Sequence, residues 1–299
     1  MQYGAASWAA TFMHIDGTTI IAGVFGAPVM HTASPAMHNA AFEALEMNWA
    51  YLAFHVDPQH LRTALHGARD MGLIGVNLTV PHKILALDCM DDVDAEARQL
   101  GAVNTVMFEK GKLRGFNTDG YGFLKALKDE FNLSVKGKRV LILGAGGAGR
   151  GIAVKCALEG ATQVIVANRS PAKIEPIARE IRNTKSGFLA IGLTVDEIRK
   201  VIPDVDLVVN ATSVGLKDGD TIGLGVEMFS KRLRVYDTIY RPAETELLKT
   251  AASAGAQVAN GLGMLLHQGA KSFEIWTKRK APLAVMRRAL RAAIYGEKS

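Results

Sequence analysis

The stretch that decides the fold is RVLILGAGGAGRGIAVKCALEG, residues 139–160. It opens on an apolar run that predicts a buried strand and continues in a pattern that predicts a helix. Between them, Gly144, Gly146 and Gly149 stand in the G-x-G-x-x-G spacing. The first glycine permits a tight turn, the second lets a pyrophosphate approach the backbone, and the third lets helix and strand pack closely. The stretch therefore predicts a dinucleotide-binding unit, with an ordinary glycine-rich turn as the alternative.

Cofactor choice depends on the end of the next strand, in TQVIVANRS at residues 162–170. An Asp or Glu there usually bonds the ribose 2′-hydroxyl of NAD. This chain has no acid at that place and carries Asn168, Arg169, Ser170 and Lys173 instead. The planar guanidinium of Arg169 can bind a 2′-phosphate and the Lys173 ammonium can add a charge, so we expect NADP. The alternative is a solvated helix start with two incidental cations.

The regions on both sides of this unit alternate between strand and helix patterns. We expect strands at residues 19–26, 49–56, 73–80, 187–193, 206–215, 233–240 and 256–261, and helices at 34–45, 58–71, 118–131, 171–181, 261–276 and 282–296. Residues 101–117 read as two strands joined by a turn at Lys110–Gly111–Lys112. Ser34 is the expected N-cap of the first helix, with Pro35 at its first position. This alternation predicts an α/β fold with a largely parallel sheet.

Composition excludes several classes of protein. The 299 residues are 48% hydrophobic, enough for a sizeable core, and the net charge is +6. No Lys/Arg block is interleaved with aromatics, so nucleic-acid binding is not expected. The two cysteines, Cys89 and Cys156, have no ligand spacing, which argues against a disulfide scaffold or metal site and suits a reducing cytoplasm.

No apolar run approaches the ~20 residues that span a bilayer. The first residues lack the pattern of a secretory signal. They could be a short disordered extension, or the chain could start at Met13.

A charge follows the buried strand in GVNLTVPHK, residues 75–83. The carboxyl ends of parallel strands face the ligand crevice, so Thr79 and Lys83 are candidates for contact with a substrate. A lysine there could be an acid/base group or bind an anion, or it could simply start the next helix on the surface. Polar residues also mark other turns. Capping alone would explain Asp119, Thr32 and Ser34, and Asn104 stands beside a strand start, so none of them is decisive when considered singly.

Together, eight segments resemble the shikimate dehydrogenase family: GAPVMHTASPAMHN, GVNLTVPHK, GAVNT, NTDG, GAGGAGRG, NRS, NATSVG and GLGMLLHQ. They follow one another in the family's order from about Gly23 to the C-terminal helices. The resemblance implies two domains. Residues 1–119 and 261–299 would form an α/β substrate domain, and residues 120–260 an NADP-binding Rossmann domain.

The implied activity is reversible NADP-dependent reduction of 3-dehydroshikimate to shikimate in aromatic amino-acid biosynthesis. The implied partner is a small carboxylic acid, without nucleic acid, membrane or metal, and the expected state is a cytoplasmic monomer or homodimer. By resemblance, Lys83 and Asp119 are the catalytic pair. The implied substrate-binding residues are Thr32, Ser34, Thr79, Asn104, Asp119, Tyr240 and Gln268. The implied cofactor-binding residues are Gly144, Ala145, Gly146, Gly147, Ala148, Asn168, Arg169, Ser170, Lys173, Thr238 and Gly261.

One departure keeps the substrate open. The family usually has serine where this chain has Thr32, and threonine at this pair of hydroxyls also occurs in relatives that take quinate. An added methyl changes discrimination by only ~1–3 kcal/mol. Quinate or another shikimate-like acid is therefore the alternative substrate. A different NADP oxidoreductase and a nonenzymatic NADP-binding protein are further alternatives. We expect His31, His82 and His267, which lie beside these motifs, to be wall or capping residues.

Overall fold

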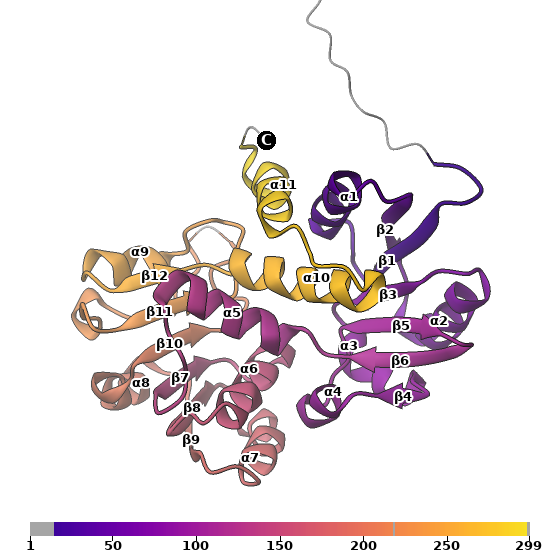
Figure 1. Cartoon of the computed structure of the whole chain (residues 1–299). Helices are drawn as coiled ribbons and strands as arrows, with labels where there is room; N and C mark the ends of the chain where they lie inside the picture. Colours follow the sequence, from indigo (N-terminus) through magenta and orange to yellow (C-terminus); the bar gives the residue numbers. More distant parts are fainter. Residues whose placement is uncertain (1–14, 218, 298–299) are drawn as a thin grey trace, which may run out of the picture.

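The computed structural model of the chain describes residues 15–217 and 219–297. Its core consists of two six-stranded sheets, one built from residues 20–116 and the other from residues 139–259. The sheets lie side by side, and two helices run across the region between them (Figure 1). The expectation about the first residues of the chain, a short extension or a start at Met13, concerns residues outside the described range.

The first sheet is mixed. It contains β1 (Ile20–Gly26), β2 (Trp49–His55), β3 (Gly75–Leu78), β4 (Asp92–Val93), β5 (Thr105–Glu109) and β6 (Lys112–Phe116), in the order β2-β1-β3-β5-β6-β4. Only β5 is antiparallel to both of its neighbours. The cause is the two-residue turn after it, where Lys110 and Gly111 both have positive φ, of 51° and 75°, as a tight hairpin requires. The expected turn is thus confirmed, while the sheet is less uniformly parallel than the alternation suggested.

The helices of this half come from both ends of the chain. The early helices are α1 (Ser34–Ala44), α2 (Leu61–Asp70), α3 (His82–Leu85) and α4 (Ala95–Leu100). The late helices α10 (Leu262–Thr277) and α11 (Leu283–Tyr295) return to share a core with α1, in which Phe42, Phe273 and Leu290 are buried together. The Trp276 indole donates to the Val106 carbonyl (3.0 Å), which fixes α10 on β5.

The second sheet is parallel throughout. It contains β7 (Arg139–Leu143), β8 (Gln163–Asn168), β9 (Gly187–Gly192), β10 (Leu207–Asn210), β11 (Arg234–Asp237) and β12 (Gln257–Ala259), in the order β12-β11-β10-β7-β8-β9. The order reverses between β10 and β7, which is where ligands bind in such sheets.

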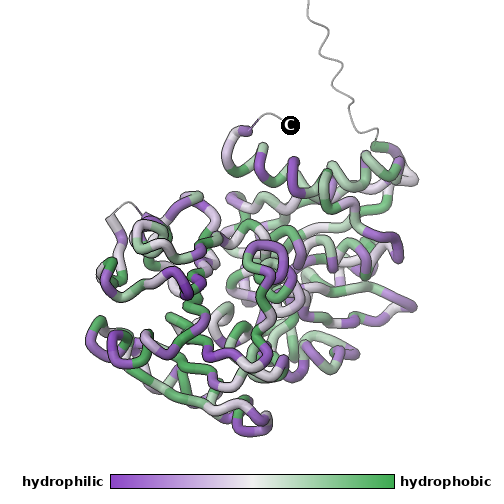
Figure 2. Tube along the Cα trace, turned by 60° about the vertical axis from the view of Figure 1, so that its left-hand side comes forward, coloured by the Kyte–Doolittle hydropathy of each residue, from purple (hydrophilic) through white to green (hydrophobic). Residues whose placement is uncertain are grey.

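Alternate residues of these strands face opposite cores. Val140 and Ile142 pack with α5 (Asp119–Phe131), α6 (Gly147–Leu158) and α7 (Glu175–Ile181) on one face. Leu141 and Leu143 pack with α8 (Val195–Val201) and α9 (Glu246–Ser253) on the other. Hydrophobic stretches accordingly run through the middle of the molecule, and hydrophilic ones gather at its outer turns (Figure 2). Burial on both faces explains why β7, β8, β10 and β11 read as continuous apolar runs, whereas β9 at the edge is largely exposed.

Helix starts differ from two expectations. The first helix begins at Ser34 itself, with Ala33 at the N-cap and no side-chain cap. Asp119 is the first residue of α5, behind Thr118, so it is not a cap either. In both cases the side chain bonds a polar side chain outside its own helix: Ser34 accepts from Thr32, and Asp119 accepts from Lys83. The expected elements missed α4, α8, α9 and the two-residue β4.

Helices α5 and α10 pack against each other along the region between the sheets (Figure 1). Gly122 makes this contact close, because a Cβ there would lie 2.8 Å from the Met264 carbonyl oxygen. The described part of the chain contains no helix with the length and apolarity needed to cross a bilayer. Nor do the described residues bring three or more His, Cys, Asp or Glu side chains into a metal-binding group. The domain boundaries after residues 119 and 260 stay a prediction.

Candidate active site

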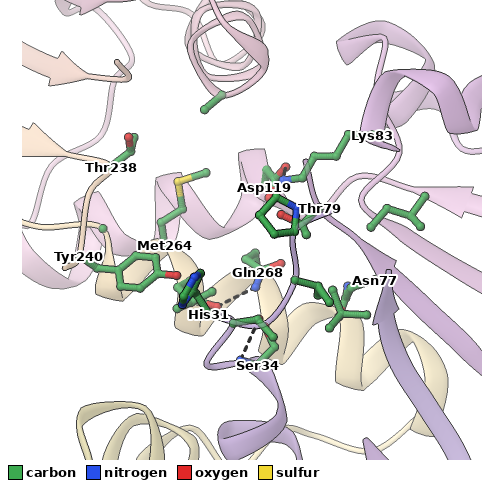
Figure 3. Close-up of a pocket in the computed structure, with 18 residues that line it drawn as sticks. His31, Ser34, Asn77, Thr79, Lys83, Asp119, Thr238, Tyr240, Met264 and Gln268 are labelled. Carbon is green, nitrogen blue, oxygen red and sulfur yellow. Dashed lines mark hydrogen bonds and ion pairs between the residues drawn. The ribbon is translucent and has the colours of Figure 1, made fainter. Parts of the chain in front are cut away.

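A pocket of about 370 Å³ opens where the two sheets face each other (Figure 3). Its walls come from the ends of β1 and β3, the starts of α5 and α6, the segment after β11, and α10. The lining residues are Val24, Pro28, Val29, His31, Thr32, Ser34, Asn77, Leu78, Thr79, Lys83, Asp119, Ala148, Thr238, Tyr240, Gly261, Met264, Leu265 and Gln268. Side chains from both sheets can therefore contact one small molecule.

A lysine–aspartate pair lies in this pocket. The chain leaves β3, turns at Pro81 and enters α3, which carries Lys83 as its second residue. The Lys83 Nζ donates to Asp119 Oδ2 at 2.6 Å. The two side chains are 32% and 21% exposed, so a ligand can still reach them. Lys83 thus stands at the start of a helix and also lines the pocket, and its catalytic role stays a prediction.

Asn104 holds the other oxygen of the aspartate. Its Nδ2 donates to Asp119 Oδ1 at 3.0 Å and to Gln268 Oε1 at 3.4 Å. Its Oδ1 accepts from the Thr118 backbone N–H at 2.8 Å. Asn104 is itself 1% exposed. The structure thus brings together four of the expected residues, Lys83, Asp119, Asn104 and Gln268.

Hydroxyl groups gather at another wall. Thr32 Oγ1 donates to Ser34 Oγ at 3.2 Å, and both residues line the pocket. Tyr240 lines it from the segment after β11, and burial raises the pKa of its phenol. The phenol therefore stays protonated near neutral pH and can donate. Thr79, at the end of β3, adds a fourth hydroxyl. Such donors suit the carboxylate and hydroxyl groups of a small acid.

The glycine turn has the geometry expected of a pyrophosphate site. Gly144 has φ of +102°, and a Cβ on Gly149 would lie 2.0 Å from the Gly144 carbonyl oxygen. A Cβ on Gly146 or Gly147 would meet nothing within 4 Å, so the start of α6 is open to a ligand. Backbone N–H groups and the helix dipole favour an anion there. Ala148 in this first turn also lines the pocket.

The residues expected to choose the cofactor follow β8. Arg169 and Lys173 are exposed, as phosphate-binding cations must be. Asn168 also bonds within the turn itself, and its contact with the cofactor stays a prediction. Its Oδ1 accepts from the Ala145 N–H (3.1 Å) and its Nδ2 donates to the Ser170 carbonyl (2.9 Å), so the amide shapes the turn.

Thr238 and Gly261 form one side of the pocket. A Cβ on Gly261 would lie 2.1 Å from the Thr238 carbonyl oxygen, so only glycine fits there. Both residues line the pocket, as does Ala148 from the phosphate turn. The two positions therefore share the pocket with the glycine turn, and their contact with the nicotinamide end stays a prediction.

The histidines take varied places. His31 lines the pocket. His82 is buried, and burial lowers the pKa of its imidazole, which keeps it neutral. The ring of His267 bonds the Asp129 carboxylate at 2.8 Å, in a contact outside the pocket lining. None of the three lies against the Lys83–Asp119 pair in the described contacts.

Several contributors escaped the sequence reasoning. Asn77 lines the pocket from the interior of β3, and Met264 and Leu265 line it from α10. Three buried hydroxyls, Thr105, Thr118 and Ser272, surround Asn104. A signal for Asn77 was present, because an amide inside an apolar strand needs buried partners.

Comparison with known proteins gives consistent matches. Residues 24–106 match the shikimate dehydrogenase substrate-binding domain, residues 125–216 the shikimate/quinate 5-dehydrogenase family, and residues 261–291 the shikimate 5′-dehydrogenase C-terminal domain. A shikimate dehydrogenase (NADP(+)) of Methanopyrus kandleri is 45% identical over 92% of this chain and 96% of its own length.

Solved structures agree with these matches. Shikimate 5-dehydrogenase of Listeria monocytogenes, in complex with shikimate and NAD, has a TM-score of 0.88 at 37% identity, covering 93% of this chain and 98% of its own. The Thermus thermophilus enzyme, in complex with NADP(H) and shikimate, has a TM-score of 0.82 at 39% identity, covering 92% and 99%. The family, and with it the two-sheet architecture, is thereby established for the whole length of the fold.

Proposed function

The chain belongs to the shikimate dehydrogenase family of oxidoreductases, and on that premise we propose that it catalyses the reversible, NADP-dependent reduction of 3-dehydroshikimate to shikimate. The observation that carries the proposal is the Lys83–Asp119 pair, which lies in one pocket with the first turn of α6. A nonenzymatic NADP-binding protein would have no use for that pair beside its phosphate turn.

The residues present suit NADP. Gly144 to Ala148 would hold the pyrophosphate at the open start of α6, and Arg169 and Lys173 would bind the 2′-phosphate. Thr238 and Gly261 would face the nicotinamide. NADPH supplies the hydride when it is bound.

The task of Lys83 is to manage charge and a proton at the reacting oxygen. When a ketone is reduced, its oxygen gains negative charge and then needs a proton. The Lys83 ammonium donates a hydrogen bond to that oxygen, stabilises the charge and supplies the proton, and it takes the proton back in the reverse direction. Asp119 keeps the ammonium in place through the 2.6 Å contact.

Substrate orientation falls to the surrounding polar groups. The hydroxyls of Thr32, Ser34 and Tyr240 would bind the carboxylate. Thr79, Asn104, Asp119 and Gln268 would bond the ring hydroxyls. Support comes from the convergence of all of these residues except Asn104 on one pocket of about 370 Å³, a volume suited to a small ring acid. Asn104 lies directly behind Asp119 and Gln268, to which its amide donates.

Quinate is the second candidate substrate because of Thr32. Its methyl group adds bulk beside Ser34, at the wall assigned to the substrate carboxylate. Quinate differs from shikimate at the ring carbon bearing that carboxylate, so this wall is where the two acids would be told apart.

We also propose the wider organisation. Residues 1–119 and 261–299 form the substrate domain and residues 120–260 the NADP domain, since each range contains one sheet. The protein works as a monomer or homodimer in the cytoplasm, on a small carboxylic acid as its partner.

The test is the formation of reduced cofactor, followed by absorbance at ~340 nm. Shikimate and quinate are each supplied with NADP and with NAD. Turnover that is highest with shikimate and NADP is the expected result. Preference for quinate would replace the substrate but keep the lysine's role. Absence of turnover in all four pairings would refute the proposed activity.

A further inference from the structure

Three buried hydroxyl groups lie behind the Lys83–Asp119 pair, and we refer to them as the hydroxyl cluster. They belong to Thr105 on β5, Thr118 before α5, and Ser272 on α10. Thr105 and Ser272 are 0% exposed and Thr118 is 1% exposed. None of the three lines the pocket, so their contribution must act through other side chains.

Ser272 is the member that links the cluster together. Its Oγ lies 2.8 Å from Thr105 Oγ1 and 3.3 Å from Thr118 Oγ1. Its single hydrogen can go either to Thr105 Oγ1 or to the Gln268 carbonyl one helical turn earlier, at 3.0 Å. It also accepts from the Asn77 amide at 2.9 Å, across 195 residues of sequence. One hydroxyl therefore ties α10, which carries Gln268, to β3, β5 and the start of α5.

A backbone N–H group and two hydroxyls of the cluster together fix which way the Asn104 amide points. The Thr118 backbone N–H can only donate, so the group facing it at 2.8 Å must be Asn104 Oδ1. The Thr105 hydroxyl donates to the same oxygen at 3.0 Å. The Nδ2 group is thereby turned to Asp119 Oδ1 at 3.0 Å and to Thr118 Oγ1 at 2.9 Å. A flipped amide would set two donors against each other.

Asn77 is fixed by the same reasoning. Its Nδ2 donates to the Asn104 carbonyl at 3.1 Å, which can only accept, while its Oδ1 accepts from the Tyr51 hydroxyl at 2.7 Å. Its amide is thus occupied by protein partners although the residue borders the pocket. Asn77 therefore supports the cluster from the border of the pocket.

Burying so many polar groups together has a cost that apolar side chains would avoid. A fully bonded buried network does, however, hold its members in one arrangement. Here that arrangement ends on the Asp119 carboxylate, whose second oxygen receives the Lys83 ammonium.

We propose that Ser272 is a positioning residue, which holds the Asn104 amide through the hydroxyl cluster and thereby directs Asp119 and Lys83 at the reacting oxygen. The expected effect on kcat rests on the proposed function, whereas the effect on the Asn104 amide can be measured without substrate.

The experiment compares two cluster variants with a matched control. Ser272→Ala removes the linking hydroxyl, and Thr105→Val removes a cluster hydroxyl with little change of shape. Thr277→Val is the control, because Thr277 lies on the same helix and donates to the Phe273 carbonyl four residues earlier at 2.8 Å, as Ser272 can to Gln268. Its hydrogen-bond partners, Phe273 and Arg279, lie outside the cluster.

Two quantities are measured for each variant. The first is kcat with shikimate, for which we expect a fall of about tenfold in both cluster variants while the KM for NADP holds. The second is the solvent exchange rate of the Asn104 side-chain amide by ¹⁵N NMR, its signal being identified by its loss in Asn104→Ala. We expect this exchange to become about tenfold faster in both cluster variants, because the amide loses its fixed partners. Thr277→Val should match the wild type in both quantities.

The two readouts separate the possible failures. Faster amide exchange in the cluster variants of a protein inactive on shikimate would support the inference and refute the proposed function. Unchanged kcat and unchanged exchange in Ser272→Ala and Thr105→Val would overturn the inference. It would be overturned equally if Thr277→Val lost as much kcat as they do, since the effect would then belong to the helix in general. Thr105→Val keeps the test decisive if Ser272→Ala does not fold.

Discussion

At the scale of single residues, the pocket depends on contacts between side chains that are far apart in sequence. Lys83 and Asp119 are separated by 36 positions and Asn104 and Gln268 by 164. Both members of the ion pair still reach solvent. Partly exposed pairs of this kind add only about 0–1 kcal/mol to stability. Their value therefore lies in the chemistry they direct, and substitution should separate the two effects.

Lys83→Met should lower kcat by at least about 100-fold, because the developing oxyanion loses its donor. The affinity for NADP and the midpoint of thermal unfolding should change little. Steady-state kinetics and cofactor titration check this. Lys112→Met, at an exposed position of β6, is the control and should retain wild-type turnover. A Lys83→Met enzyme with near-normal kcat would remove the lysine from the mechanism.

Arg169→Ala should raise the KM for NADP by about 100-fold and leave the KM for NAD nearly unchanged. The reason is that only NADP carries the ribose 2′-phosphate, to which a guanidinium can form a bidentate pair. The measurement is the ratio of kcat/KM for the two cofactors. Arg179→Ala, exposed on α7, serves as the control. An equal loss for both cofactors would contradict the assignment of Arg169.

Sequence reasoning reached much of this pocket but not what lies behind it. Thr79 and Lys83 follow β3, where topology predicts exposure to a ligand. Thr32 and Tyr240 entered the expected site only through the family resemblance. Ser272 could not be found in this way, because a serine on a helix is ordinary until its partners are known. Those partners come from three other elements, and no local pattern predicts which will meet.

At the scale of elements, glycine sets how closely α6 approaches β7. A Cβ on Gly149 would lie 2.0 Å from the backbone oxygen of Gly144, which cannot move aside as a side chain could. Gly151 lies on the same helix, and a Cβ there would meet nothing within 4 Å. Both positions are glycines of one helix, but only Gly149 has backbone atoms so close that a Cβ would clash with them.

Gly149→Ala should therefore lower the free energy of unfolding by about 1–3 kcal/mol through overpacking. Gly151→Ala should leave it unchanged or raise it by up to about 1 kcal/mol, since alanine favours helix. Urea titration of both variants measures the difference. Equal effects at the two positions would show that close packing does not explain the third glycine.

The same scale shows where pattern reading succeeds. The strands of the second sheet were expected because they are apolar on both faces, and the helices α10 and α11 because they are long and amphipathic. The short helices α4, α8 and α9 were missed. Each begins after a side-chain cap, at Asp94, Thr194 and Thr245, and that local signal was available. The turn at Lys110 and Gly111 was expected, but the antiparallel direction that it gives to β5 was not.

At the scale of the whole molecule, a charge contact joins the two sheet-bearing halves. Lys155 on α6 is largely buried, and its Nζ contacts Glu96 on α4 and Glu159 on its own helix, both at 3.0 Å. Burial alone would lower the pKa of Lys155, but the hydrogen bonds that its ammonium donates to these carboxylates outweigh burial and raise it. Gly120, the residue after Asp119, packs closely beneath them, because a Cβ there would lie 3.0 Å from Glu96 Oε1.

Glu96→Gln should lower the free energy of unfolding by about 1–2 kcal/mol, because it weakens a partly buried contact between the halves. Glu159→Gln removes only an exposed i,i+4 partner and should cost less than about 0.5 kcal/mol. Denaturant titration distinguishes them, with the same lysine serving both. A larger loss for Glu159→Gln would show that the lysine stabilises its own helix instead of the junction.

The return of α10 and α11 has a consequence for how the protein is made. The core in which Phe42 of α1 packs with Phe273 of α10 cannot form until α10 has left the ribosome. The strands of the second sheet are complete by Ala259, before Gln268 has been added. Domains generally fold as units during synthesis. The half proposed to bind the nucleotide can therefore fold before α10 and α11 have been synthesised. The pocket, which includes Gln268 on α10, forms only after that half has folded.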